Sequence, residues 1–232
     1  MDLGCGDGIF GKLTYGYIDV GVDLDTHEVQ RAKSVQGYED LIVADARCMP
    51  FRSETFNVII GNSVMEHIPN FKKVLKEAGR VMTSEGRIIL TVPTSKFNTN
   101  SILSTVFRRV GAINSKRMYE AKRNDYFKHI NLFEPYTLKK ILEYVGFQLT
   151  CRHYAPRRFL YAFDLLHPFN YHLLRRFLHT NLLTTSIKII LSLIGKERLI
   201  RIMSVLLTPF IFNSHDAEGS NLFIIAKKSA DA

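Results

Sequence analysis

The chain has 232 residues, of which 46% are hydrophobic and 23% are charged, and this composition excludes wholesale disorder and fits one sizeable core with an appendage. Its formal net charge is +9, and the positive charge is concentrated in two segments. Residues 94–130 carry eight Lys and Arg against two acids, and residues 151–213 carry nine against two. Such segments indicate an anionic partner, namely a phosphate-bearing substrate, nucleic acid or a bilayer surface, with solvated helix faces as the ordinary alternative.

The N-terminal half predicts a parallel sheet with helices between its strands. Short apolar runs rich in β-branched residues predict strands, and amphipathic runs with apolar residues at helical spacing predict helices. The predicted strands are Tyr17–Leu24, Asp40–Ala44, Phe56–Gly61 and Gly86–Val92, and the predicted helices are Thr26–Val35 and Asn70–Met82. This alternation is typical of an α/β fold. If Met1–Leu3 ends a first strand, most of that strand is missing, so we expect a truncated start.

The second half predicts a cover segment, a helix and two further strands. Residues 94–128 are polar and basic and follow the predicted strand Gly86–Val92, where an open α/β sheet places its ligands. After them we expect a helix over Leu138–Val145 that stops at Gly146. The two last predicted strands are Phe147–Arg152 and Ser220–Lys227.

An insertion separates these two last strands. Residues 154–219 contain apolar runs interleaved with basic residues, and each run is shorter than the roughly 20 residues that a spanning helix needs. We expect a helical insertion that lies in a membrane interface, with a helical subdomain or an oligomer contact as the ordinary alternative. The rest, residues 1–153 and 220–232, is expected to form the main domain.

Three cysteines, Cys5, Cys48 and Cys151, show no CxxC spacing, which argues against a cysteine-based zinc site and a disulfide scaffold. The N-terminus lacks the basic and apolar pattern of a signal peptide. We therefore expect a cytoplasmic protein that is peripheral on the inner face of a membrane.

A glycine-rich turn is the main motif of the chain. Asp2-Leu3-Gly4-Cys5-Gly6-Asp7-Gly8 stands between a predicted strand and a helix, and glycines there let the backbone approach a ligand closely. The overlapping Gly6-Asp7-Gly8-Ile9-Phe10-Gly11 also fits the GxGxxG dinucleotide fingerprint. An acid near the end of the next predicted strand, Asp23, would accept ribose hydroxyls in both cases, so this turn alone leaves an NAD-dependent oxidoreductase open.

Further motifs separate the two interpretations. Val43-Ala44-Asp45-Ala46 and Asn62-Ser63-Val64-Met65-Glu66-His67-Ile68 follow the next two strands, and His129 leads into Leu132-Phe133. With these motifs the chain resembles the class I S-adenosylmethionine-dependent methyltransferases, specifically the type 11 small-molecule group that includes quinone-biosynthesis enzymes. The resemblance covers about residues 1–153 and 220–228. It implies a Rossmann-like, mostly parallel seven-stranded sheet in the order 3-2-1-4-5-7-6.

The resemblance also implies a binding site for S-adenosyl-L-methionine. The glycine turn would hold the methionine part of the cofactor, Asp2 would meet its ammonium group, and Asp23 would accept both ribose hydroxyls. Leu24 would pack on the adenine, and Asp45 would accept its amino group. Carboxylates suit these donors because they are acceptors only. The residues expected to contact the cofactor are Asp2, Gly4, Cys5, Gly6, Gly8, Asp23, Leu24, Asp45, Ala46 and Asn62.

Methyl transfer is a direct displacement at a sulfonium carbon, so it needs alignment, exclusion of water and, for an oxygen acceptor, removal of a proton, but no metal. The candidates for a general base are His129, His67 and Glu66, with capping or packing as their ordinary roles.

The acceptor is expected to be a small or lipid-linked molecule. Enzymes that methylate amino groups of bases carry Pro-Pro and an aromatic after the Asn or Asp of the fourth strand, whereas Ser63 and Val64 follow Asn62 here. Cytosine C5 methylation needs a Pro-Cys nucleophile at that place, and Cys48 lies elsewhere. Nucleic acid is therefore not the expected acceptor. A catalytically inactive methyltransferase-like module remains a further alternative, because of the short first strand.

Overall fold

The computed structural model describes residues 1–154, 160, 164 and 219–229, with the backbone alone for Cys151–Tyr154. The chain divides into two compact units. The first comprises Met1–Thr94, His129–His153 and Asn221–Ala232, and the second comprises Ser95–Lys128 and Tyr154–Ser220. Nearly all of the predicted insertion, 154–219, lies outside the described residues, so its structure and its membrane contact stay predictions.

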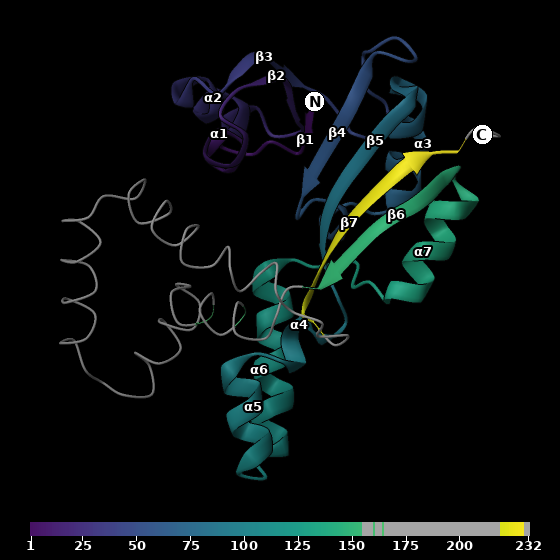
Figure 1. Ribbon diagram of the computed structural model, residues 1–232. Coiled ribbons are helices and arrows are strands. Elements are labelled where there is room, and N and C mark those ends of the chain that lie inside the picture. The colour runs from purple at the N-terminus through teal and green to yellow at the C-terminus, as the bar shows by residue number, and fades with distance from the viewer. Residues whose placement is uncertain (155–159, 161–163, 165–218, 230–232) are drawn as a thin grey trace. The chain divides into compact units, whose positions relative to one another are not determined.

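A seven-stranded sheet forms the first unit, in the order β3-β2-β1-β4-β5-β7-β6 (Figure 1). The first five strands pair in parallel, and β7 runs antiparallel to β5. The predicted Rossmann-like order is therefore confirmed. The strands are β1 Asp2–Leu3, β2 Ile18–Asp23, β3 Tyr38–Val43, β4 Phe56–Asn62, β5 Met82–Pro93, β6 Phe147–Tyr154 and β7 Asn221–Lys228.

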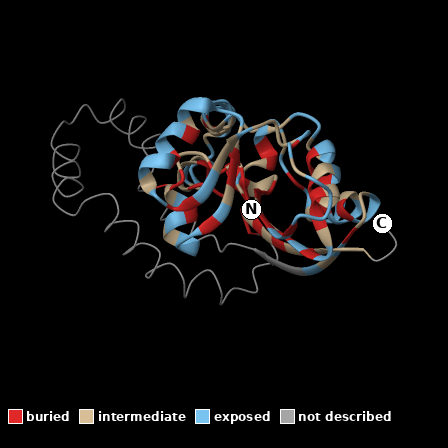
Figure 2. Cartoon of the chain, turned by 90° about the horizontal axis from the view of Figure 1, so that it is seen from above, coloured by how far each residue is buried: buried red, intermediate tan, exposed pale blue. Residues whose placement is uncertain are grey.

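Helices connect the strands of this unit. They are α1 Ile9–Tyr15, α2 Thr26–Val35, the 3-10 turn η1 Met65–His67, α3 Phe71–Val81 and α7 Pro135–Tyr144. The apolar residues of α3 recur at helical spacing, and they are buried against the sheet: Val74, Leu75, Ala78 and Val81. Figure 2 shows the same separation across the chain, with buried residues along the strands and exposed residues on the outer helix faces. The hydrophobic effect of these faces holds the helices on the sheet.

One strand begins earlier than the sequence predicts. We predicted β5 from Gly86, but it begins at Met82, directly after α3. Met82 is fully buried and pairs with Phe56, and the register then shifts between Phe56 and Val58. Such a bulge adds residues to one strand without changing the apolar pattern, so the pattern could not reveal the longer strand.

The basic stretch 94–128 is helical in the second unit. It forms α4 Lys96–Thr99, α5 Ile102–Arg109 and α6 Ile113–Phe127. Ser101 caps α5 with its side chain, which accepts a hydrogen bond from the Ser104 N–H. Among the described residues, no helix combines the length and the hydropathy that crossing a membrane requires.

A buried ion pair lies in the second unit. Arg123 of α6 is fully buried, and its Nη2 lies 2.7 Å from Oδ1 of the buried Asp164. The guanidinium lies over the rings of Phe97 and Phe127, at 4.6 Å and 5.0 Å from their centroids. Asp164 also accepts a hydrogen bond from the Ile102 N–H at 3.0 Å. Loss of either partner would leave a buried charge uncompensated, so this pair fixes how α4, α5 and α6 pack.

Candidate functional site

The glycine turn follows β1 at the carboxyl edge of the sheet. Gly4, Gly6 and Gly8 all have positive φ, at 72°, 52° and 76°. The N–H of Gly6 donates a hydrogen bond of 2.8 Å to Oδ2 of Asp23 at the end of β2. A Cβ on Gly6 would meet no atom within 4 Å, so the turn presents bare backbone beside a carboxylate. Gly8 is the N-cap of α1.

Gly4 fits against the residue that follows the next strand of the sheet. A Cβ on Gly4 would lie 2.5 Å from Cγ2 of Val64, which is too close for real atoms. The N–H groups of Gly4 and Cys5 both donate to the carbonyl of Val22, at 2.7 Å and 3.0 Å. Packing and hydrogen bonds thus hold the turn between β2 and the segment after β4.

Asp2 is buried within β1, and its carboxylate accepts a hydrogen bond of 2.7 Å from the hydroxyl of Tyr38. Burial raises the pKa of Asp2, and the bond from Tyr38 opposes this shift. The negative charge of Asp23 adds a smaller rise in the same pKa. The two acids therefore influence each other at one edge of the sheet.

Asp23 ends β2, and both of its carboxylate oxygens are oriented by backbone donors. Oδ2 accepts from Gly6, and Oδ1 accepts from the N–H of Asp25 at 2.9 Å. Leu24 follows directly, and its side chain is 67% exposed although it is large and apolar. An oriented carboxylate beside an exposed apolar side chain suits a ligand with both hydroxyl groups and an aromatic ring.

Asp45 follows β3 in a turn in which its carbonyl accepts from the N–H of Cys48 at 2.9 Å. Its carboxylate forms a salt bridge of 2.7 Å with Arg47, which lowers the pKa of Asp45. Ala46, between these two residues, is partly buried. The carboxylate is therefore ionised and ready to accept, with one cation already beside it.

Cys5 and Asn62 take structural positions at the same edge. Cys5 is buried, and burial raises the pKa of its thiol to about 12, so it is not a nucleophile at neutral pH. Asn62 ends β4, and its Oδ1 accepts from the Thr91 hydroxyl of β5 at 2.5 Å. These contacts hold neighbouring strands together and leave the amide NH₂ of Asn62 for other partners.

The three candidate bases converge after β4. Glu66 and His67 lie in η1, and the rings of His67 and His129 are 5.5 Å apart between centroids. One ligand-type atom from each of Glu66, His67 and His129 lies within 4.8 Å of the others. The structure thus brings together three residues that are far apart in sequence.

Backbone hydrogen bonds hold this cluster in place. The carbonyl of Glu66 accepts from the N–H groups of Ile130 and Asn131, at 2.8 Å and 3.0 Å. The side-chain NH₂ of Asn131 donates to the carbonyls of Met65 and Ile68, both at 3.0 Å. Residues 129–131 are therefore fastened to η1, and His129 is placed beside His67.

Glu66 differs from the two histidines in its burial. Its side chain is 1% exposed, whereas His67 is exposed and His129 is partly buried. Burial raises the pKa of Glu66 to about 7, with hydrogen bonds from its own backbone and from Ser63 opposing this. A carboxyl poised near neutrality is typical of functional sites, although it also occurs in structural networks.

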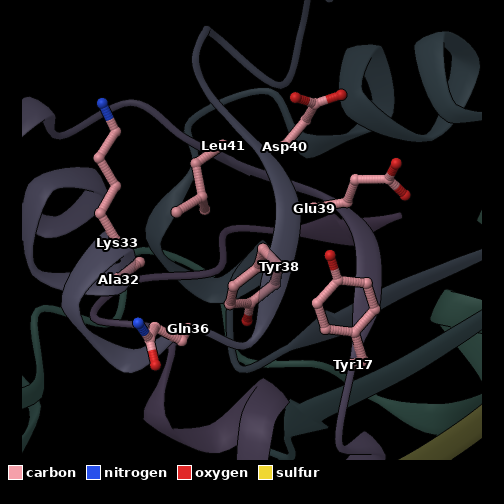
Figure 3. Close-up of a pocket in the computed structure, with 8 residues that line it drawn as sticks. All are labelled: Tyr17, Ala32, Lys33, Gln36, Tyr38, Glu39, Asp40 and Leu41. Atoms are coloured by element: carbon pink, nitrogen blue, oxygen red, sulfur yellow. The ribbon is translucent and has the colours of Figure 1, made fainter.

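An open depression of about 520 Å³ lies at the other end of the strands (Figure 3). Tyr17, Tyr38, Glu39, Asp40 and Leu41 line it from the amino-terminal parts of β2 and β3. In open α/β sheets ligands bind beyond the carboxyl ends of the strands. The depression therefore does not coincide with the glycine turn or with the histidine cluster.

Two residues that hold the site together were missed by the sequence reasoning. Tyr38 supports Asp2 from a neighbouring strand, and Asn131 ties His129 to η1. Tyr38 is an aromatic residue at the start of a strand, and such a position predicts only a packing role in the core. Asn131 lies two residues after His129, and this His-x-Asn spacing was the only available sign of a connecting role.

Comparisons with known proteins match the N-terminal part of this chain to a methyltransferase domain. Residues 1–90 match the family model described as a methyltransferase domain. The chain is 34% identical over 98 residues to malonyl-[acyl-carrier protein] O-methyltransferase of Legionella pneumophila. The matched region covers 39% of this chain and 34% of that protein. These matches support a methyltransferase domain of the class I S-adenosylmethionine-dependent type in the N-terminal part of the chain.

Solved structures share the fold of this chain. A putative sarcosine dimethylglycine methyltransferase from Galdieria sulphuraria has a TM-score of 0.57 and 14% identity, over 99% of this chain and 76% of that one. Geranyl diphosphate C-methyltransferase from Streptomyces coelicolor, solved with S-adenosyl-L-homocysteine, has a TM-score of 0.56 and 13% identity. This likeness covers 98% of this chain and 69% of that one. The chain spans between about one third and two thirds of the length of the first curated relatives it matches.

S-adenosylmethionine is the cofactor that the methyltransferase-domain match implies, and the site fits it. The Gly6 backbone leaves a cradle that any side chain would narrow, and Asp23 stands beside it. Leu24 and Asp45 follow β2 and β3 along the same edge. The family match therefore favours this cofactor over the NAD alternative.

Proposed function

We propose that this chain transfers the methyl group of S-adenosylmethionine to a small-molecule or lipid-linked acceptor. The observation that carries the proposal is the bond between the Gly6 N–H and the Asp23 carboxylate, which joins the bare glycine turn to a ribose-type acceptor group. Asp2, Gly4, Cys5, Gly6 and Gly8 would surround the methionine part. The adenosine would lie along Asp23, Leu24, Asp45 and Ala46, with Asn62 at the far side.

The bound cofactor supplies an electrophilic methyl group on a sulfonium. The residues of this chain would have to align an acceptor with that methyl group and exclude water. The oriented carboxylate of Asp23 and the exposed side chain of Leu24 provide fixed anchor points for the adenosine. Preorganised groups of this kind reduce the entropic cost of alignment.

Proton removal from an oxygen acceptor would fall to the cluster after β4. His67 is exposed and His129 is partly exposed, so either imidazole can meet an acceptor proton. Glu66 lies behind them and is nearly inaccessible. We therefore assign His129 and His67 to proton transfer and Glu66 to their support.

The lipid-linked form of the acceptor is supported by sequence and charge. Residues 151–213 carry nine basic residues against two acidic ones among long apolar runs. An anionic bilayer surface attracts such segments, at about 1 kcal/mol per basic residue near the surface. Replacement of Arg157, Arg158, Arg175 and Arg176 by Glu should reduce binding to anionic vesicles and leave the cofactor affinity unchanged.

Methyl transfer from tritiated S-adenosylmethionine into fractions of a cell extract tests the activity itself. We expect label in the lipid or small-molecule fraction. Label confined to RNA would identify a nucleic-acid methyltransferase. Cofactor binding with no label in any fraction would favour a methyltransferase-like module without activity.

A further inference from the structure

Three side chains with metal-binding atoms converge at η1. The carboxylate of Glu66 and one ring nitrogen each of His67 and His129 lie within 4.8 Å of one another, the only such group in the part of the chain that the structure describes. The three residues all belong to the first unit. Two imidazoles and a carboxylate are a set that binds divalent transition ions.

The buried carboxylate gives a second and independent observation. Glu66 is 1% exposed, and its Oε2 has no hydrogen-bond partner among the described residues. A buried carboxylate oxygen without a partner is costly and therefore rare. A cation bound between Glu66 and the two histidines would satisfy this oxygen.

The surroundings orient the set as metal sites require. The backbone N–H groups of Ile130 and Asn131 donate to the carbonyl of Glu66. The side chain of Asn131 also donates to the carbonyls of Met65 and Ile68. Partners of this kind fix ligand orientation and commonly change metal affinity by about 10–100-fold. His67 is exposed, so an ion can enter from solvent.

From this geometry we propose that Glu66, His67 and His129 bind one divalent first-row transition ion such as Zn²⁺. Ligand atoms about 2.1 Å from a tetrahedral ion lie about 3.4 Å apart, so atoms within 4.8 Å of one another must close by up to about 1.4 Å. A change in the side-chain torsion angles of the exposed His67 would contribute to this closure. The three protein ligands leave a coordination position open.

The open coordination position of the ion indicates which class of acceptor the protein takes, and this inference rests on the proposed function. An ion with two neutral imidazoles and one carboxylate would keep a net positive charge and would bind an acceptor oxygen. With the ion bound, the two imidazoles are ligands and not bases, so the ion would take over proton removal by lowering the pKa of the bound hydroxyl, whose proton passes to solvent. The inferred acceptor is then an alcohol, phenol or enol that coordinates the ion through the oxygen to be methylated.

Titration of the metal-free protein with Co²⁺ tests the site, because Co²⁺ reports its ligands in the visible spectrum and Zn²⁺ displaces it. We expect one Co²⁺ per chain, with an affinity at least about tenfold weaker in His67→Ala, His129→Ala and Glu66→Gln. His67 is exposed, so its variant tests the ligand without disturbing the core. His27→Ala, an exposed histidine on α2, is the matched control and should bind like the wild type.

Binding of S-adenosylmethionine is measured on the same proteins, with and without chelator. Absence of Co²⁺ binding by the wild type, or equal binding by His67→Ala and His129→Ala, would overturn the metal site while normal cofactor binding leaves the proposed function standing. Co²⁺ binding that depends on both histidines supports the site even if the cofactor fails to bind, and that failure would count against the proposed function alone.

Discussion

The hydroxyl of Tyr38 donates a hydrogen bond of 2.7 Å to the buried carboxylate of Asp2, and this contact joins β3 to β1 across the intervening strand β2. This contact supports the strand that leads into the glycine turn. The contact makes a prediction about stability that is separate from cofactor binding.

Tyr38→Phe should lower the free energy of unfolding at pH 7 by about 1–3 kcal/mol, because the charged Asp2 loses its partner. Burial already raises the pKa of Asp2, and loss of the bond raises it further. A carboxyl with a raised pKa in the folded state favours folding at low pH, and this contribution is lost as the pH rises. The penalty should therefore be smaller at pH 4 than at pH 7 in urea unfolding. The exposed Tyr17→Phe is the control, and an equal penalty at both pH values would refute the assignment.

Gly4→Ala should destabilise the protein by about 1–3 kcal/mol, since the new methyl group would overlap Val64 at a position with positive φ. The double variant Gly4→Ala with Val64→Ala should recover part of this loss, because only the overlap is relieved. Thermal unfolding of the two variants and of Val64→Ala alone gives the comparison. No recovery in the double variant would show that backbone strain, and not contact with Val64, limits this position.

Asn131→Ala should loosen the His129 segment, because two hydrogen bonds to the carbonyls of Met65 and Ile68 are lost. Each such bond contributes about 0.5–1.5 kcal/mol to the free energy of unfolding. We expect a lower melting temperature and a slower methyl transfer with unchanged cofactor affinity. A variant with normal transfer kinetics would mean that the position of His129 does not matter for the reaction.

Asp45→Ala should weaken cofactor binding by about tenfold, the effect of losing a hydrogen bond to a charged group. Arg47→Ala removes the cation beside Asp45 and lets its lowered pKa return toward the ordinary range, with the carboxylate still ionised at pH 7. This second variant should bind the cofactor as the wild type does. Equal losses in both variants in calorimetric titrations would indicate that the salt bridge, and not the carboxylate, shapes the site.

The sequence predicted the strands and the carboxyl-edge residues because these follow from local patterns, whereas the sheet order followed from the resemblance to the methyltransferase family. Strand periodicity, the glycine turn and an acid after each strand all lie within short windows. The contacts of Tyr38 with Asp2 and of Asn131 with η1 join residues far apart in the chain, and no window contains both partners. Only the folded sheet brings them together.

The helices of residues 95–128 were missed for a different reason. Helix α6 has charged and polar residues on every side, including the buried Arg123, so it shows no apolar stripe. Arg123 can be buried because it forms an ion pair with Asp164 and cation–π contacts with two phenylalanine rings. A buried ion pair of this kind cannot be told from a solvated arginine by sequence pattern alone.

The most direct test of the central claim is calorimetric titration of S-adenosylmethionine into the wild type, Asp23→Asn and Asp40→Asn. Asp23 accepts the Gly6 N–H at the carboxyl edge, whereas Asp40 is an exposed acid nearer the amino end of β3 and serves as the matched control. We expect one cofactor per chain, an affinity at least about tenfold lower in Asp23→Asn, and an unchanged affinity in Asp40→Asn. Wild-type binding by Asp23→Asn, or tight binding of NAD in place of S-adenosylmethionine, would contradict the account.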